Sequence, residues 1–171
     1  MTMEITFLPL ELPRWDLARG DTLAVCLFSD VRPLRGAAGL LDWRLNGKLS
    51  RWIGSGRLAG DDGEQTLFPS DKRVAWRSLL ALGLGASKDF DEARFRGALQ
   101  RGLGAMRGLG LRQLALALPG REAEKIPARR AIELVLDESK GAALDELTVI
   151  DTPGAQKEMV DVIRRRRQAP H

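Results

Sequence analysis

The sequence predicts one α/β domain with a mainly parallel or mixed sheet flanked by helices. Short apolar runs alternate along the chain with longer segments of helical periodicity, which is the pattern of α/β proteins. The run Thr22–Phe28 (TLAVCLF) is almost wholly apolar, as expected for a strand that is covered on both faces. A chain of 171 residues can bury a core of this kind. We expect residues 1–152 to form the domain and residues 153–171 to form a closing helix with a basic tail.

Strands are predicted where apolar runs are bounded by turn residues or prolines. They are Glu4–Leu8, Thr22–Phe28, a short strand at Gln65–Phe68, Arg77–Gly83, Gln113–Leu118 and Leu147–Ile150. Helices are predicted from periodicity and capping residues at Gly39–Ile53, Asp91–Arg107, Pro127–Ser139 and Pro153–Gln168. The second helix follows an Asp89-x-x-Glu92 pattern, which is typical of a capping box.

The helix predicted over Gly39–Ile53 has two distinct faces. Its apolar face carries leucines at helical spacing, and its basic face carries Arg44, Lys48 and Arg51. Gly47 lies inside it at a cost of about 1 kcal/mol against alanine, which we attribute to close packing. Trp43 and Trp52 lie beside the basic face. Because tryptophan and arginine anchor protein interfaces, these five residues form a candidate contact surface.

The net charge of +4 is concentrated at the end of the chain. Without four consecutive arginines, 23 basic residues remain and balance the 23 acidic ones. We therefore expect no basic face on the body of the fold, and a nucleic-acid role is confined to the tail. The arginines also suit the C-terminal end of a helix dipole. They are Arg164, Arg165, Arg166 and Arg167.

Several kinds of site are excluded by residue content. The one cysteine, Cys26, leaves neither an internal disulfide nor a multi-cysteine zinc site, and we expect it to be a small buried hydrophobe. The one histidine, His171, is the last residue, which argues against histidine-based triads and metal centres. No apolar run reaches eighteen residues, so we expect a cytoplasmic protein with no membrane contact, no cofactor and no metal.

The loop before the Gly39–Ile53 helix is the candidate ligand site. Gly36 and Gly39 would present backbone amides at a helix N-terminus, and Arg32 and Arg35 flank them. Such groups converge on phosphates in other proteins, so a nucleotide-like or other anionic small molecule is one candidate ligand. A surface loop with incidental arginines is the competing interpretation.

Two stretches carry a resemblance to a known family. They are Leu79–Pro119, with its strand, Gly-Leu-Gly turn, acidic cap and glycine-studded helix, and Leu40–Glu64, with its helix and glycine turn. In order and spacing they resemble the N-terminal domain of the leucyl aminopeptidase family, and the resemblance covers about residues 20–163. It implies a three-layer, macro-like fold. It also implies that Asp21, the following strand and the Gly36 loop correspond to the acidic residue, strand and glycine loop of macro domains.

The resemblance also sets limits. Cys26, Leu27 and Phe28 stand where macro domains are rich in asparagine, which argues against ADP-ribose chemistry. The family's catalytic Asn-Thr-Asp-Ala-Glu-Gly-Arg motif does not occur, so we expect a stand-alone domain that is not an enzyme. The first hypothesis is an association module that pairs with itself, as a homo-oligomer, or with a separate catalytic aminopeptidase chain. The alternatives are an anionic small-molecule site and, third, nucleic-acid binding through the arginine tail.

Overall fold

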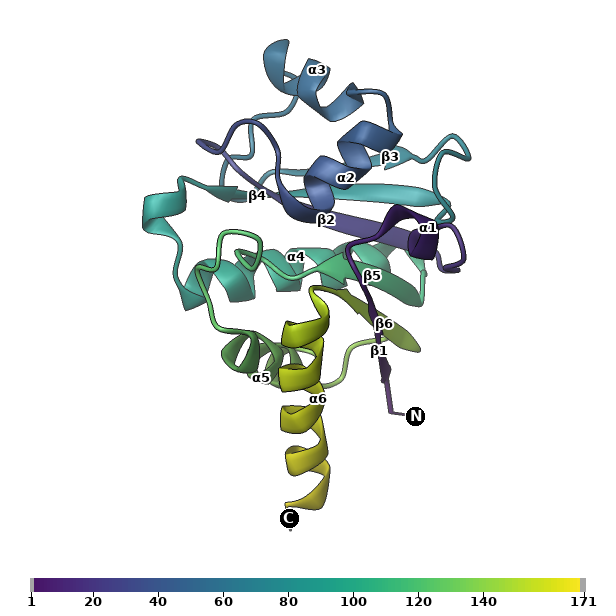
Figure 1. Cartoon of the computed structure of the whole chain (residues 1–171), viewed down its shortest axis with the longest axis vertical. Coiled ribbons are helices and arrows are strands. Elements are labelled where there is room, and N and C mark those ends of the chain that lie inside the picture. The colour runs from purple at the N-terminus through teal and green to yellow at the C-terminus, as the bar shows by residue number, and fades with distance from the viewer. Residues whose placement is uncertain (1, 170–171) are drawn as a thin grey trace.

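A six-stranded sheet in the order β1-β6-β5-β2-β4-β3 forms the centre of the molecule (Figure 1). The computed structural model describes residues 2–169. All neighbouring strands pair in parallel except β3 and β4, which are antiparallel. The mixed α/β fold that the sequence predicts is thereby confirmed. The strands are β1 (Glu4–Leu8), β2 (Thr22–Phe28), β3 (Gln65–Pro69), β4 (Ser78–Gly85), β5 (Gln113–Ala117) and β6 (Glu146–Ile150).

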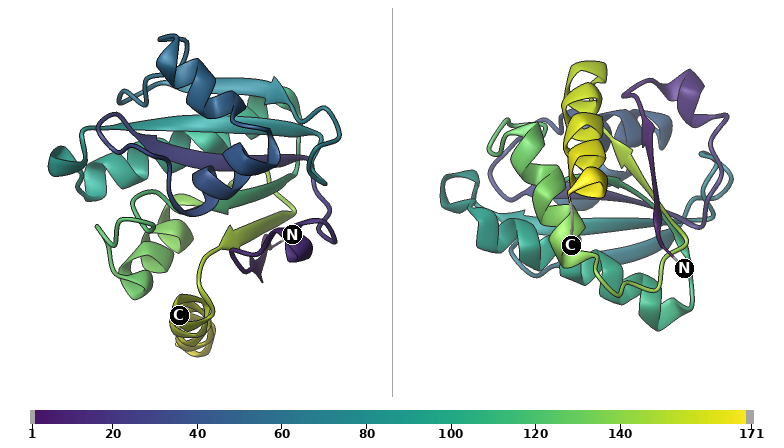
Figure 2. Two further views of the ribbon diagram at one scale, coloured as in Figure 1. Left: turned by 45° about the horizontal axis from the view of Figure 1, so that its top comes forward. Right: turned by 90° about the horizontal axis from the view of Figure 1, so that it is seen from below.

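Helices cover both faces of the sheet, as the two views of Figure 2 show. One apolar cluster joins the sheet to α4, α5 and α6, and a second joins its other face to α1, α2 and α3. The helices are α1 (Leu12–Trp15), α2 (Gly36–Arg44), α3 (Lys48–Gly54), α4 (Glu92–Leu109), α5 (Ala128–Glu138) and α6 (Pro153–Gln168), with a short 3-10 turn, η1, at Ser87–Asp89. Within residues 2–169, no helix combines the length and the apolar character that crossing a membrane requires.

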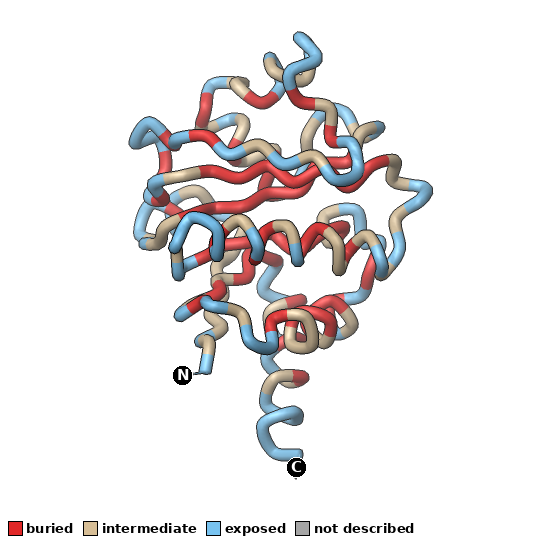
Figure 3. Tube along the Cα trace, turned by 180° about the vertical axis from the view of Figure 1, so that it is seen from behind, coloured by how far each residue is buried: buried red, intermediate tan, exposed pale blue. Residues whose placement is uncertain are grey.

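Burial follows the position of each strand in the sheet (Figure 3). Strand β2 lies between β4 and β5 and is buried at all of its positions, because helices cover both of its faces. Strand β3 lies at one edge and is buried only at Phe68. The apolar pattern of each strand therefore reflects its position in the sheet: β2 is continuously apolar at the centre, and β3 has few buried positions at the edge.

The prediction of one helix over Gly39–Ile53 is wrong, because the chain forms α2 and α3 with a break between them. Asn46 (φ 55°) and Gly47 (φ 76°) both adopt the left-handed conformation, which cannot continue a right-handed helix. The Asp42 carboxylate then accepts hydrogen bonds from the backbone and hydroxyl of Ser50, across the break. Gly47 thus serves a left-handed turn rather than close packing, since an added Cβ would meet only Arg51 Nη1 at 3.5 Å.

Two further local features differ from the prediction. The N-cap of α4 is Asp91, whose carboxylate accepts a hydrogen bond from the Arg94 backbone at 2.9 Å, while Asp89 lies in the 3-10 turn before it. The predicted capping box is therefore wrong by two residues. Helix α1 was not predicted. Its Trp15 is fully buried, donates to the Pro9 carbonyl at 2.8 Å and meets Trp76 edge-on.

Candidate functional site

Two adjoining cavities open at the carboxyl edge of the sheet, which is where α/β proteins place ligands. The larger is about 190 Å³ and lies between the ends of β5 and β6 and the start of α2, at Gly36. The smaller is about 90 Å³ and lies between the end of β2 and α2, at Cys26 and Arg35. Glu122, in the loop after β5, lines both of them.

The carboxyl group of Glu122 dominates the electrostatics of these cavities. Its pKa is raised to about 7, mainly by burial and to a smaller extent by the nearby Asp151, while its own backbone N–H and Arg121 oppose the rise. Gly36 (φ +58°) passes directly over it, since a Cβ on Gly36 would come within 2.7 Å of the Glu122 Cβ. The glycine is therefore required both for the left-handed turn and for the close approach.

A buried ion pair closes the wall of the larger cavity. Asp151, at the end of β6, is 5% exposed, and its carboxylate accepts from Arg121 Nε at 2.9 Å. Arg121 Nη1 also donates to the Ile126 carbonyl at 2.8 Å. The Arg121 guanidinium is thus committed to the protein, so it holds the loop in place rather than presenting a free cation to a ligand.

The structure brings only part of the predicted ligand site together. Arg35 is the N-cap residue of α2 and lines the smaller cavity, and Gly36 and Gly39 lie in the first turn of α2. Arg32 points elsewhere, because its guanidinium donates to the carbonyls of Phe28, at 2.8 Å, Val31 and Ala59. It ties the loop after β2 to the loop before β3.

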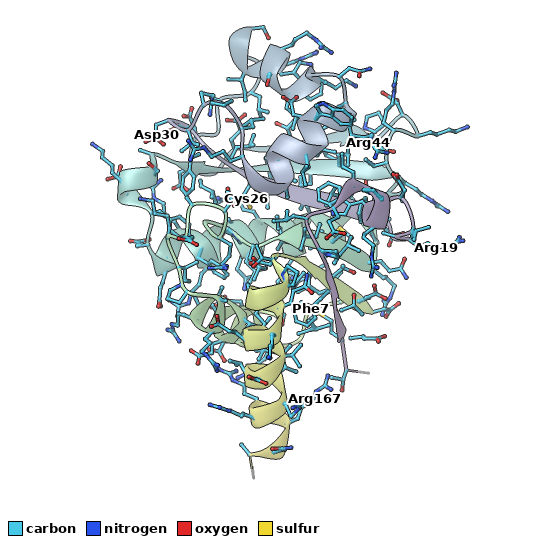
Figure 4. All side chains as sticks on the ribbon, in the orientation of Figure 1. Phe7, Arg19, Cys26, Asp30, Arg44 and Arg167 are labelled. Atoms are coloured by element: carbon cyan, nitrogen blue, oxygen red, sulfur yellow. The ribbon has the colours of Figure 1, made fainter. Side chains whose placement is uncertain are left out.

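Asp21 is not part of this edge. Its carboxylate accepts hydrogen bonds from the backbone N–H groups of Arg112, at 2.9 Å, and Gln113, at 3.0 Å, and so fastens the start of β5 to the start of β2. The seven residues of β2 span roughly 20 Å at about 3.3 Å per residue. Figure 4 labels Arg19 and Asp30, which precede and follow β2, on opposite sides of the molecule. The prediction that Asp21 joins the glycine-loop site is therefore wrong.

Of the five residues of the predicted contact surface, Trp43 is highly exposed and the other four contact groups within the chain. Trp43, in the last turn of α2, is 73% exposed. Trp52 instead packs edge-on against Phe68 with ring centroids 4.9 Å apart, and the cations of Lys48 and Arg57 lie over its ring. Trp43 is consequently available to a partner, whereas Trp52 joins α3 to β3.

The three basic residues of that surface bind neighbouring groups. Arg44 forms a two-pronged ion pair with Asp16 at 2.7 and 3.2 Å, and Lys48 pairs with Asp71 at 3.3 Å. Arg51 donates to the Asn46 carbonyl and steadies the break between α2 and α3. The Arg44–Asp16 pair fastens α2 to the end of α1, where Leu17 is 80% exposed. Sequence reasoning missed Leu17, because a single leucine in a loop carries no periodic signal.

The remaining predicted residues are placed as follows. The four arginines of the tail lie exposed in the last turns of α6, and Arg166 pairs with Asp137 at 2.7 Å. Cys26 is buried, its Sγ lies 3.6 Å from the Ala117 carbonyl, and burial raises the pKa of its thiol, so the thiolate is disfavoured. His171 lies outside the described residues. Among residues 2–169, no three His, Cys, Asp or Glu side chains are grouped so that they could hold a metal ion.

Comparison with known proteins places this geometry in context. Residues 24–140 match the model of the cytosol aminopeptidase family, N-terminal domain. The probable cytosol aminopeptidase of Thermosynechococcus vestitus is 30% identical over 132 residues, which are 76% of this chain and 26% of that protein. The chain therefore spans about a quarter of the length of this relative.

Solved structures show the same fold at low sequence identity. A mutant of tomato leucine aminopeptidase matches with a TM-score of 0.65 and 18% identity, over 95% of this chain and 36% of that one. The Trypanosoma brucei macrodomain in complex with ADP matches with a TM-score of 0.73 and 15% identity, over 94% of this chain and 69% of that one. The macro-like architecture that the sequence resemblance implies is confirmed.

Proposed function

Because the chain belongs to the cytosol aminopeptidase family, through its N-terminal domain, we propose that it is a non-catalytic association module. It pairs with itself or with a separate catalytic aminopeptidase chain. The observation that carries this proposal is Trp43, a large aromatic side chain that α2 holds 73% exposed. Tryptophan is enriched among the residues that contribute most to protein interfaces.

The surroundings of Trp43 favour a contact surface. The ion pair of Arg44 with Asp16 fixes the last turn of α2 against α1, so the surface is ordered before a partner arrives. Leu17 and Trp43 are the two most exposed large apolar side chains of the described residues; Trp43 is in α2, and Leu17 follows the end of α1. Burial of the exposed part of a tryptophan contributes about 4 kcal/mol, from roughly 150 Å² at about 25 cal/mol per Å².

Sedimentation of the purified protein, alone and mixed with a catalytic cytosol aminopeptidase, tests the proposal. We expect either a self-associated species or a complex, and we expect Trp43→Ala to dissociate it. Leu109→Ala is the control, because Leu109 is an exposed apolar residue outside this surface, at the end of α4. A wild-type protein that stays monomeric and leaves the aminopeptidase unbound would contradict the proposal.

The second candidate is an anionic small-molecule site at the carboxyl edge. It has in its favour the likeness to macrodomains and the position of Arg35 and Gly36 beside the cavities. Two features oppose it. The cavities, at about 190 and 90 Å³, are smaller than the roughly 300 Å³ at which ligand pockets begin, and Glu122 presents a carboxyl group to both of them.

A thermal-shift series with ADP, ADP-ribose and inorganic phosphate separates the two candidates. Stabilisation by one of these compounds that Arg35→Ala abolishes would favour the ligand site. No shift with any of them, together with association that depends on Trp43, would favour the association module. Because Arg35 and Trp43 lie at opposite ends of α2, each variant probes one surface.

A further inference from the structure

A groove lies at the end of the molecule opposite Trp43. It is about 580 Å³ in volume and is bounded by β1, by the end of α5 with the turn that follows it, and by the last turns of α6. Figure 4 labels Arg167 near this end and Arg44, next to Trp43, near the other. We call it the α6 groove. Its floor consists of apolar side chains that are partly buried against the core: Met3, Ile5, Leu136, Ala142 and Ile163.

The apolar floor continues along α6. A second hollow of about 390 Å³ shares Ile163 and Arg167 with the α6 groove and adds Val160. Val160 is 36% exposed although it is a branched apolar residue. The two hollows therefore form one apolar track that is open to solvent and runs beside the end of α6. Contiguous exposed apolar surface of this kind marks interaction sites in soluble proteins.

The rim of the track is cationic. The described residues that line the two hollows include Lys140, Arg164, Arg166 and Arg167 but no carboxylate. Asp137, just outside, pairs with Arg166 at 2.7 Å and with Lys140 at 3.7 Å, and Glu133 also attracts Arg166, which leaves Arg164 and Arg167 as the cations in excess. The potential over the track is therefore positive, and a complementary partner carries negative charge.

We propose that the α6 groove binds an acidic peptide segment of a partner protein, with apolar side chains on the floor and carboxylates on the rim. The apolar side chains of such a segment would pack on the floor, and its carboxylates would pair with the cations of the rim. Peptides dock in this way when apolar anchors enter a groove and charges flank it. The site is distinct from the Trp43 surface, so it extends the proposed association function to a second contact.

Other occupants fit less well. A second copy of the chain docked groove to groove would bring the same arginines together, and like charges in contact oppose association. A nucleic acid would engage the arginines but leave Ile163 and Val160 uncovered. The residues that line the two hollows also offer no aromatic ring on which a base could stack.

Two arginines that lie two positions apart in α6 provide a matched pair of variants. Arg165 and Arg167 are both exposed in the last turn, but only Arg167 lines the two hollows. Arg165→Glu and Arg167→Glu therefore change the net charge by the same amount, but only Arg167→Glu changes the charge that lines the groove. Ile163→Ser removes an apolar part of the floor without changing charge, and its melting temperature reports whether the fold is retained.

Fluorescence anisotropy measures the binding of three labelled probes to the full chain. One is a short peptide with leucines at helical spacing and glutamates between them, the second has lysines in place of the glutamates, and the third is a single-stranded oligonucleotide. We expect the acidic peptide to bind and the lysine peptide to fail. For the acidic peptide, Arg167→Glu should weaken affinity about tenfold and Arg165→Glu about twofold at most, since a contacting charge has far more effect than a distant one.

Three outcomes would overturn the proposal. The first is a wild-type chain that fails to bind the acidic peptide at concentrations at which the melting curve shows it folded. The second is an equal loss of affinity in the two arginine variants, with weaker oligonucleotide binding by the same factor, which would assign the tail to nucleic acid. The third is an unchanged affinity of Ile163→Ser for the acidic peptide, which would leave no role for the floor. Trp43→Ala should not alter any of these measurements.

Discussion

Replacement of Glu122 by glutamine tests the electrostatic account of the carboxyl edge. The folded protein raises the pKa of Glu122 from 4.5 to about 7, chiefly because the carboxyl group is buried between α2 and the loop after β5. Glutamine has nearly the same shape but carries no charge at any pH. The variant therefore removes the ionisation while it keeps the contact with Gly36.

The sign follows from proton binding. Between pH 4.5 and 7 the folded state holds a proton on Glu122 that the unfolded state has released, so stability falls as pH rises through this window. Below this pH window the ionisation of Glu122 does not lower the stability of the fold, and above it the full loss of stability is present. A difference of this size in pKa corresponds to about 3 kcal/mol, at about 1.4 kcal/mol per pKa unit. We expect Glu122→Gln to match the wild type near pH 4 and to exceed its stability near pH 8.

Urea denaturation at a series of pH values measures this difference. Glu124→Gln is the control, because Glu124 lies two residues away and is exposed. We expect Glu124→Gln to keep the wild-type pH dependence and Glu122→Gln to lose most of it. A wild-type free energy of unfolding that did not change from pH 5 to pH 8 would refute the electrostatic account. A Glu122→Gln variant that kept the wild-type pH dependence would also refute it.

Four further variants report on the packing. Arg121→Ala leaves the Asp151 carboxylate buried without its partner and should cost about 4 kcal/mol in a urea denaturation experiment. Glu64→Gln weakens the carboxylate that accepts from three consecutive backbone N–H groups in the loop before β3, and should lower the unfolding free energy by about 1–2 kcal/mol. Trp15→Ala should cost about 4 kcal/mol because Trp15 is fully buried, whereas Trp43→Ala should change stability by less than about 0.5 kcal/mol.

The elements predicted best are those whose sequence signal and tertiary environment agree. Strand β2 begins and ends at the predicted residues, because an apolar run bounded by Asp21 and Ser29 leaves little choice of boundary. Helix α6 also matches at both ends, since Thr152 caps it with a hydrogen bond to the Ala155 backbone and Pro153 occupies its first turn. Strong local signals of this kind need no knowledge of distant residues.

The break between α2 and α3 could not be read from periodicity. Leu41, Leu45 and Leu49 are all buried on the same side of the sheet, so the apolar spacing continues through a turn that is not helical. The signal that was available is the pair Asn46–Gly47, two residues that adopt the left-handed conformation readily. Interpreting Gly47 as a packing residue within one helix gave it the wrong role.

The candidate site was harder to predict than the fold, because its members are brought together by topology. Glu122 is one of several charged residues in a short loop, and nothing in its neighbourhood in the sequence indicates that the loop folds under Gly36. Asp21 shows the converse, since it precedes β2 whereas the glycine loop follows it. Parallel strands place their carboxyl ends at one edge, so a residue before a strand and a residue after it lie at opposite edges of the sheet.

The carboxyl edge, the Trp43 surface and the α6 groove are chemically different, and this difference bears on how the domain works. At the edge, the carboxyl group of Glu122 and the Arg121–Asp151 pair line the larger cavity. Apolar side chains stay open to solvent instead at Trp43 and in the α6 groove, on opposite sides of the sheet and at opposite ends of the molecule. An occupant of one surface therefore does not block the other. With both proposed contacts occupied, the domain would join two partners at once.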